Sequence, residues 1–201
     1  MKIDDKRLDL SANFKPDLSD LATEIHADNL AAGWWTDMAS GQSTLHTRNR
    51  PEMLMLAVSE IAEAALGTDG RKDDKLPHLP MYDVELADFV IRQLDLIGAE
   101  VACGQARSKF GWCPSDGYRA MSRGDRLMNL VITVASAMEH YRKGRMTAYA
   151  GDLRYSVVQA FAIAEVDHID LFDIIAQKRA FNATRSDHQI ANRMKEGGKR
   201  F

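Results

Sequence analysis

Two pairs of carboxylates, each pair three residues apart, are the side chains in this sequence whose types and spacing are best suited to chemistry. Glu60 and Glu63 form the first pair, and Glu85 and Asp88 form the second. Positions i and i+3 share one face of a helix, so both acids of a pair point the same way. Four buried carboxylates would carry a charge of −4, which two divalent cations balance. Hard oxygen ligands suit Mg²⁺, and Mn²⁺ can take its place.

The residues around these acids predict that they face the interior of a helical bundle. An E-x-x-E pair alone is more often part of a solvated helix face. Here the second pair lies on a segment whose only polar stripe is Glu85, Asp88, Arg92 and Asp95. A helix that is apolar on nearly all sides is buried. The apolar residues of this segment are Val84, Leu86, Ala87, Phe89, Val90, Ile91, Leu94 and Leu96.

Length and composition are those of an ordinary globular protein. The chain has 201 residues, 45% of them hydrophobic and 27% charged, which is enough for one domain with a sizeable core. The net charge of −3 gives no general attraction to nucleic acid or anionic membranes. Cys103 and Cys113 form neither a metal-binding spacing nor a disulfide framework. No apolar run is long enough to span a membrane, so we expect a cytoplasmic protein.

The hydrophobic spacing predicts an all-α domain of about five to six helices. We expect a polar arm over residues 1–16, long loops over 36–50 and 102–118, and no strands. Helices are predicted from Asp17, from Pro51 to Leu66, from Asp83 to Gly98, from Asp125, from Asp152 to Ala164, and from Asp170.

Other polar side chains lie where they can meet an anionic ligand. Lys75 belongs to a charged loop between the two acid-bearing segments. Lys178, Asn182 and Arg185 follow helical spacing along the last predicted helix. The alternative for Lys75 is a solvated loop without a ligand, and the alternative for the other three residues is a frayed, solvated last turn. Four residues near the first helix are candidates for contacts with a base or sugar: His26, Asn29, Trp34 and Trp35. The alternative for the two tryptophans is a role as core or interface anchors, and the alternative for His26 is a hydrogen-bonded core histidine.

Taken together, these segments resemble the MazG-like branch of the all-α nucleoside triphosphate pyrophosphohydrolases. That family has E-x-x-E on one helix and E-x-x-D on the next, here separated by 21 residues. The runs Ser59–Ala64 and Asp73–His78, and the residues Lys178, Phe181–Arg185, Asp187 and His188, are also similar to bacterial and phage members. The likeness covers residues 17–98 and 165–201 of a single domain. Residues 99–164 are less typical of a compact member.

The resemblance implies a metal-dependent enzyme that hydrolyses a nucleoside triphosphate to the monophosphate and pyrophosphate. A deoxynucleotide such as dGTP is the expected substrate, and Mg²⁺ is the expected cofactor. The implied metal ligands are Glu60, Glu63, Glu85 and Asp88, with Glu63 as the first candidate for the general base and Glu60 as the second catalytic acid. Lys75, Lys178 and Arg185 would contact phosphates, and Asn182 the sugar or a phosphate. A homodimer or homotetramer is implied, without membrane or nucleic-acid partners.

Other functional classes make different demands on the sequence. A ferritin-like di-iron bundle would use Glu-x-x-His motifs, and neither acid pair ends in histidine. A non-catalytic nucleotide-binding module or helical scaffold would need no interior acids. For Lys178 we expect a position outside the core, where substitution costs less than about 1 kcal/mol of stability. The tail from Gly197 is expected to form a lid.

Overall fold

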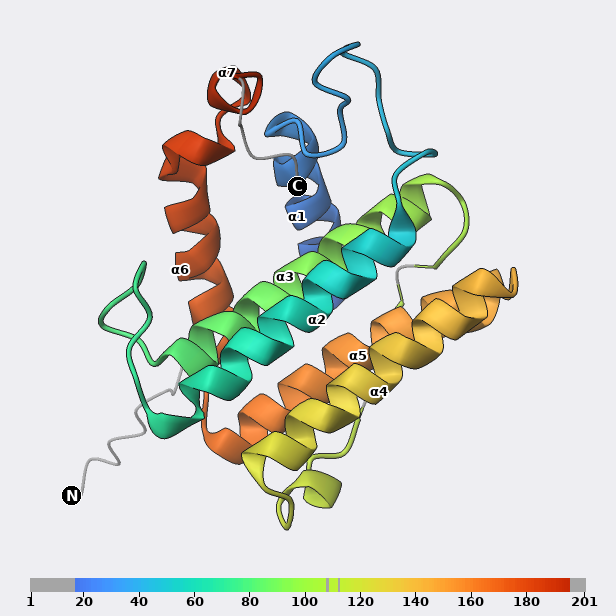
Figure 1. The fold of residues 1–201 in the computed structure, drawn as a ribbon. Coiled ribbons are helices and arrows are strands. Elements are labelled where there is room, and N and C mark those ends of the chain that lie inside the picture. The colour runs from blue at the N-terminus through green and yellow to red at the C-terminus, as the bar shows by residue number, and fades with distance from the viewer. Residues whose placement is uncertain (1–16, 108, 112, 196–201) are drawn as a thin grey trace, which may run out of the picture.

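The computed structural model describes residues 17–107, 109–111 and 113–195, and this part of the chain contains seven α-helices and no strand. The predicted all-α fold is therefore confirmed (Figure 1). The predicted arm over residues 1–16 and the predicted lid from Gly197 lie outside the described residues. The helices are α1 (Leu18–Ala31), α2 (Arg50–Leu66), α3 (Met81–Ala102), α4 (Arg123–Arg142), α5 (Met146–Asp167), α6 (Leu171–Thr184) and α7 (Ile190–Arg193).

Side-chain caps fix where several helices begin. Asp17 accepts a hydrogen bond from the Ser19 backbone N–H at the start of α1. Asn49 caps α2 in the same way, with proline in the first turn. Ser122 and Asp170 cap α4 and α6. These residues satisfy backbone donors that have no partner inside the helix, which is why a helix starts at each of them.

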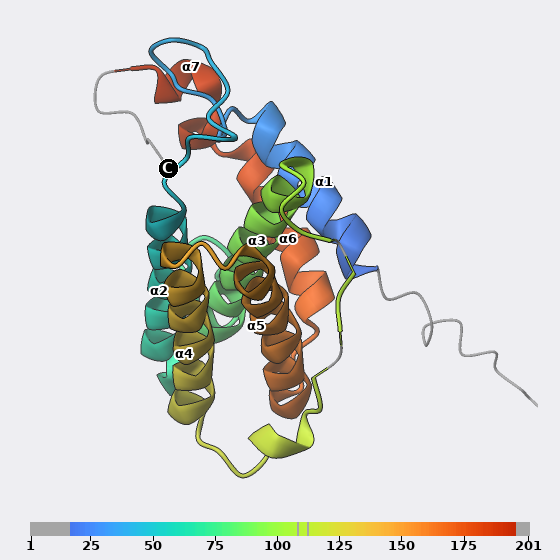
Figure 2. The same ribbon diagram turned by 90° about the vertical axis from the view of Figure 1, so that its right-hand side faces the viewer.

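Helix α3 is the centre of the fold and packs against α1, α2, α5 and α6. Figure 2 shows α2 and α4 side by side along one edge and α1 and α6 along the other. Residues on several sides of α3 are fully buried, including Val84, Phe89, Val90 and Leu94. The apolar sequence of this segment is explained by its four neighbours. None of the described helices is long and apolar enough to cross a membrane.

Gly98 was predicted to end the third helix, and this prediction is wrong. Helix α3 continues to Ala102. A Cβ atom at Gly98 would lie 2.5 Å from the His26 Cβ and 2.9 Å from the Ala22 carbonyl oxygen. The glycine is therefore needed because α1 crosses α3 closely at this point, and not because the helix stops.

Other helix boundaries also differ from the prediction. Helix α5 begins at Met146 instead of Asp152, and its first turns already bury Tyr149 and Ala150. Gly144, with φ of +67°, makes the tight turn between α4 and α5. The sixth helix ends at Thr184, so Arg185 is extended and does not continue the helical face. The short helix α7 was not predicted.

Candidate functional site

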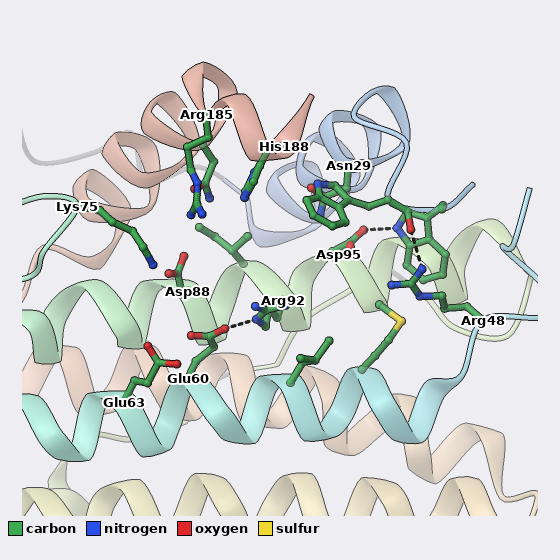
Figure 3. Close-up of a pocket in the computed structure, with 16 residues that line it drawn as sticks. Asn29, Arg48, Glu60, Glu63, Lys75, Asp88, Arg92, Asp95, Arg185 and His188 are labelled. Atoms are coloured by element: carbon green, nitrogen blue, oxygen red, sulfur yellow. Dashed lines mark hydrogen bonds and ion pairs between the residues drawn. The ribbon is translucent and has the colours of Figure 1, made fainter. Parts of the chain in front are cut away.

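The packing of α2 against α3 brings three of the four predicted acids together. Oxygen atoms of Glu60, Glu85 and Asp88 lie within 4.8 Å of one another. Glu60 and Glu85 are buried, and Asp88 is partly buried. Glu63 does not belong to this acid cluster. It is exposed and lies one turn further along α2 (Figure 3).

Burial makes the negative charges of this cluster costly. Burial raises the pKa of Glu85 to about 8, and the charge of Asp88 adds to the effect. Burial also raises the pKa of Asp88, although the Lys178 ammonium acts in the opposite direction. Glu85 Oε2 is buried without a hydrogen-bond partner among the described residues. Three carboxylates with an unpartnered buried oxygen suit an oxygen-liganded cation such as Mg²⁺ or Mn²⁺.

Two protein cations partly balance the acids. Lys178 Nζ lies 2.7 Å from Asp88 Oδ2, and Arg92 forms an ion pair with Glu60. The expectation that Lys178 occupies a position outside the core is wrong, because its side chain is only 1% exposed. Helix α6 packs against α3, and Leu171, Ile174 and Ile175 of α6 are buried together with the lysine.

A cavity of about 230 Å³ lies next to the acid cluster, between α1, α2, α3 and the segment that follows α6. Figure 3 shows Lys75, Glu63 and Asp88 at one end of the cavity, and Asn29, Asp95 and Arg48 at the other. Nine of the twelve predicted site residues line it: Asn29, Trp34, Trp35, Glu60, Glu63, Lys75, Asp88, Asn182 and Arg185. The other three, His26, Glu85 and Lys178, lie behind its wall.

Seven further residues line the cavity, and sequence reasoning did not assign them to the site: Arg48, Met53, Leu56, Ile91, Arg92, Asp95 and His188. Arg92 and Asp95 follow Glu85 and Asp88 on the polar stripe of α3, so their position on that stripe could have identified them as site residues. His188 lies in a segment whose sequence resembles the MazG-like family. Arg48 follows no recognisable pattern, because a loop brings it to the cavity.

A buried polar network forms the end of the cavity that is farther from the acids. His26 Nδ1 lies 2.7 Å from Asp95 Oδ1, and the Trp35 indole N–H donates to the same oxygen at 2.9 Å. The two rings meet edge to face with centroids 5.2 Å apart. His26 is thus a hydrogen-bonded core histidine, the alternative considered from the sequence. The Trp35 ring lines the cavity while its N–H is occupied by Asp95.

The segment after α6 covers one side of the cavity. His188 meets the Trp34 ring edge to face, with centroids 5.1 Å apart. Arg193 stacks over the same indole at 3.6 Å and donates from Nη1 to the Ala32 carbonyl at 3.0 Å. Arg185 still lines the cavity, where its Nη2 lies 2.6 Å from Asp187 Oδ2. These contacts attach the C-terminal segment to the end of α1.

Comparisons with known proteins do not place this chain in a family. No protein-family model matches it, and neither the curated proteins nor the solved structures include a significant match.

Proposed function

We propose that this protein is a metal-dependent nucleoside triphosphate pyrophosphohydrolase. The observation that carries the proposal is the cluster of Glu60, Glu85 and Asp88 beside a cavity whose wall also carries cationic side chains. Acids that hold a divalent ion and cations that meet phosphate oxygens are the two requirements of phosphoryl chemistry. The MazG-like sequence pattern of the same acids supports the same class.

Each polar residue then has a definable task. Glu60, Glu85 and Asp88 would hold Mg²⁺ or Mn²⁺, which when bound would polarise phosphate oxygens and lower the pKa of a water. Glu63 lies beside the cluster and lines the cavity, where its carboxylate can accept a proton from the attacking water.

The cationic and amide side chains of the wall would orient the substrate. Lys75 and Arg185 would bind phosphate oxygens, and Asn182 would donate to a phosphate or the sugar. Lys178 would act from behind the wall by fixing Asp88. The proposed substrates are nucleoside triphosphates, including deoxynucleotides such as dGTP, and the proposed location of the protein is the cytoplasm.

The test is a panel of ribo- and deoxynucleoside triphosphates with Mg²⁺ or Mn²⁺, run in ¹⁸O-labelled water. We expect monophosphate and pyrophosphate as the first products, with the label in one of them. Glu60→Gln should abolish turnover, whereas Glu139→Gln, which alters an acid on α4 whose side chain is 43% exposed, should not. Orthophosphate as the first product would assign the protein to a different class of phosphatase.

A non-catalytic nucleotide-binding module is the second candidate. It is favoured by one observation: Lys178 and Arg92 already pair with two of the three clustered acids. Such a module would bind nucleotides with the same affinity in EDTA and in Mg²⁺, and would release no product.

A homo-oligomer, a dimer or a tetramer, is part of the proposal. Large apolar side chains on α2 and α4 are exposed, among them Met55 at 66% and Ile132 at 60%. Surface of this kind is typical of contacts between subunits. Light scattering coupled to size-exclusion chromatography measures the mass, and Ile132→Glu should lower it to that of one chain. A monomeric wild-type protein would contradict this part of the proposal.

A further inference from the structure

Asp95 lies two helical turns from the acid cluster and faces the same cavity. Asp88 and Asp95 both line it from α3, seven residues apart, which is about 10 Å along the helix axis and nearly the same face. A nucleotide whose phosphates meet the acid cluster would extend its base toward Asp95. The side chain at position 95 therefore influences which base the cavity accepts.

The hydrogen bonds of Asp95 leave one oxygen for a ligand. His26 and Trp35 both contact Oδ1, at 2.7 and 2.9 Å. Within the described part of the chain, no donor contacts Oδ2. The Asp95 side chain is only 8% exposed, so its remaining oxygen has little contact with bulk water. A polar atom in this position gains most from a partner that the ligand brings.

The scaffold holds this carboxylate in one orientation. His26 comes from α1, whose close approach to α3 depends on Gly98. Trp35 is 1% exposed, and its ring packs edge to face on His26. Two buried aromatic donors on one oxygen fix the rotation of the carboxylate, so that Oδ2 is a rigid acceptor.

We propose that Asp95 reads the base of the nucleotide, and that the preferred substrates carry an exocyclic amino group, as adenine, guanine and cytosine do. The inference rests on the proposed function and adds the substrate class. An amino group extends beyond the ring and donates to Oδ2. Uracil and hypoxanthine carry a carbonyl oxygen, which is an acceptor, where cytosine and adenine carry the amino group, and two acceptors facing each other in a buried site repel. His26 and Trp35 are positioning residues for Asp95.

The same network predicts an unusual effect of Asp95→Asn. His26 and Trp35 both require an acceptor at the Oδ1 position. The amide of the variant must therefore place its carbonyl oxygen there and its NH₂ group at the Oδ2 position. The substitution changes the polarity of the base contact from acceptor to donor while keeping its shape, so the preference for bases should reverse.

Binding constants test the inference without relying on turnover. We would measure Kd by calorimetry for non-hydrolysable α,β-methylene analogues of CTP, UTP, ATP and ITP in Mg²⁺. Wild-type protein should bind the CTP analogue more tightly than the UTP analogue, and the ATP analogue more tightly than the ITP analogue, by roughly tenfold or more, as expected for one hydrogen bond to a charged group. Equal affinities within both pairs would overturn the inference.

The variants then locate the effect. Asp95→Asn should lower the CTP-to-UTP affinity ratio at least tenfold, whereas a folded Asp95→Asn protein with the wild-type ratio would overturn the role of Asp95. Asp152→Asn is the matched control, because Asp152 also pairs with a histidine, His140, at 3.0 Å on α4 and α5. It should keep the wild-type ratio.

Three further outcomes are decisive. If Asp95→Asn does not fold, Trp35→Phe removes one of the two donors and should bring the ratio toward one, which a general loss of structure would not do. An unchanged ratio in that variant would count against the inference. Binding of amino-bearing analogues without any turnover would refute the proposed hydrolysis and leave the base preference standing. Absence of all nucleotide binding would overturn both.

Discussion

Lys178 on α6 and Asp88 on α3 form a nearly enclosed ion pair, with Nζ and Oδ2 2.7 Å apart. The lysine is 1% exposed and the aspartate side chain 16% exposed. Because Asp88 belongs to the acid cluster, the pair connects helix α6 to the site at the centre of the fold. The same contact contributes to the stability of the fold and to the charge of the site.

Removal of Lys178 should therefore lower the stability of the folded protein and not only its rate of catalysis. Lys178→Ala leaves Asp88 without its cation and opens a buried space, and we expect a loss of about 3 kcal/mol in the free energy of unfolding, as for other broken buried pairs. Urea unfolding measures it. Lys178→Met with Asp88→Asn should cost less than the two single changes added together. Lys75→Ala, at an exposed loop position, is the control and should change stability by less than about 0.5 kcal/mol.

A divalent cation should stabilise the folded protein. Mg²⁺ or Mn²⁺ at millimolar concentration should raise the melting temperature, because only the folded chain brings Glu60, Glu85 and Asp88 together. Glu60→Gln or Asp88→Asn should remove most of that rise, and Glu139→Gln should leave it intact. A melting temperature that is equal in EDTA and in metal would refute a cation site at this cluster.

The pKa of Glu85 predicts a pH dependence of the metal-free protein. A glutamate in the unfolded chain titrates near pH 4.5, whereas Glu85 in the folded chain has a pKa raised to about 8 by burial and by Asp88. Between these values the folded chain holds a proton that the unfolded chain has lost. Stability should consequently fall as pH rises from about 4.5 to about 8. Urea midpoints measured in EDTA across this range would follow it.

Glu85→Gln is the variant that isolates this group. Because glutamine does not titrate, the fall in stability between pH 5 and pH 8 should be shallower than in the wild type. Mg²⁺ should reduce the slope in the wild type, since a bound cation favours the carboxylate form. Identical slopes for wild type and variant would mean that Glu85 titrates normally in the folded chain.

Much of this arrangement could be predicted from sequence because it depends on local periodicity. The i, i+3 spacing of the acids and the apolar residues around Glu85 and Asp88 identified two buried helices, and three of the four acids do meet. Capping residues located the starts of α1, α2 and α6. These signals are local, so one sequence suffices to show them.

What the sequence did not reveal depends on how distant segments pack. Gly98 reads as a helix end, and only the proximity of His26 explains why a glycine continues the helix. Lys178 reads as a polar extension of α6, and only the packing of α6 on α3 encloses it. Arg48 reaches the cavity through a loop that has no periodicity.

The last prediction concerns the C-terminal segment that covers the cavity. Helix α7 has four residues, Ile190–Arg193, which is too short to be stable without tertiary contacts. Arg193 supplies such contacts: it is 4% exposed, stacks on Trp34 at 3.6 Å and bonds the Ala32 carbonyl. Because His188 lies in the same segment and lines the cavity, the position of the cavity wall depends on Arg193.

Arg193→Ala should therefore loosen this wall without altering the acid cluster. We expect faster amide hydrogen exchange over residues 186–194 and a rise in the nucleotide KM of roughly tenfold, with kcat changed much less, because the lost interaction is one of binding. Lys195→Ala is the matched control, since Lys195 is exposed and, among the described residues, its Nζ bonds only locally, to Asn192 Oδ1 at 2.6 Å. Unchanged exchange and KM in Arg193→Ala would show that His188 keeps its place without the arginine, and that the contact with Trp34 does not hold the wall.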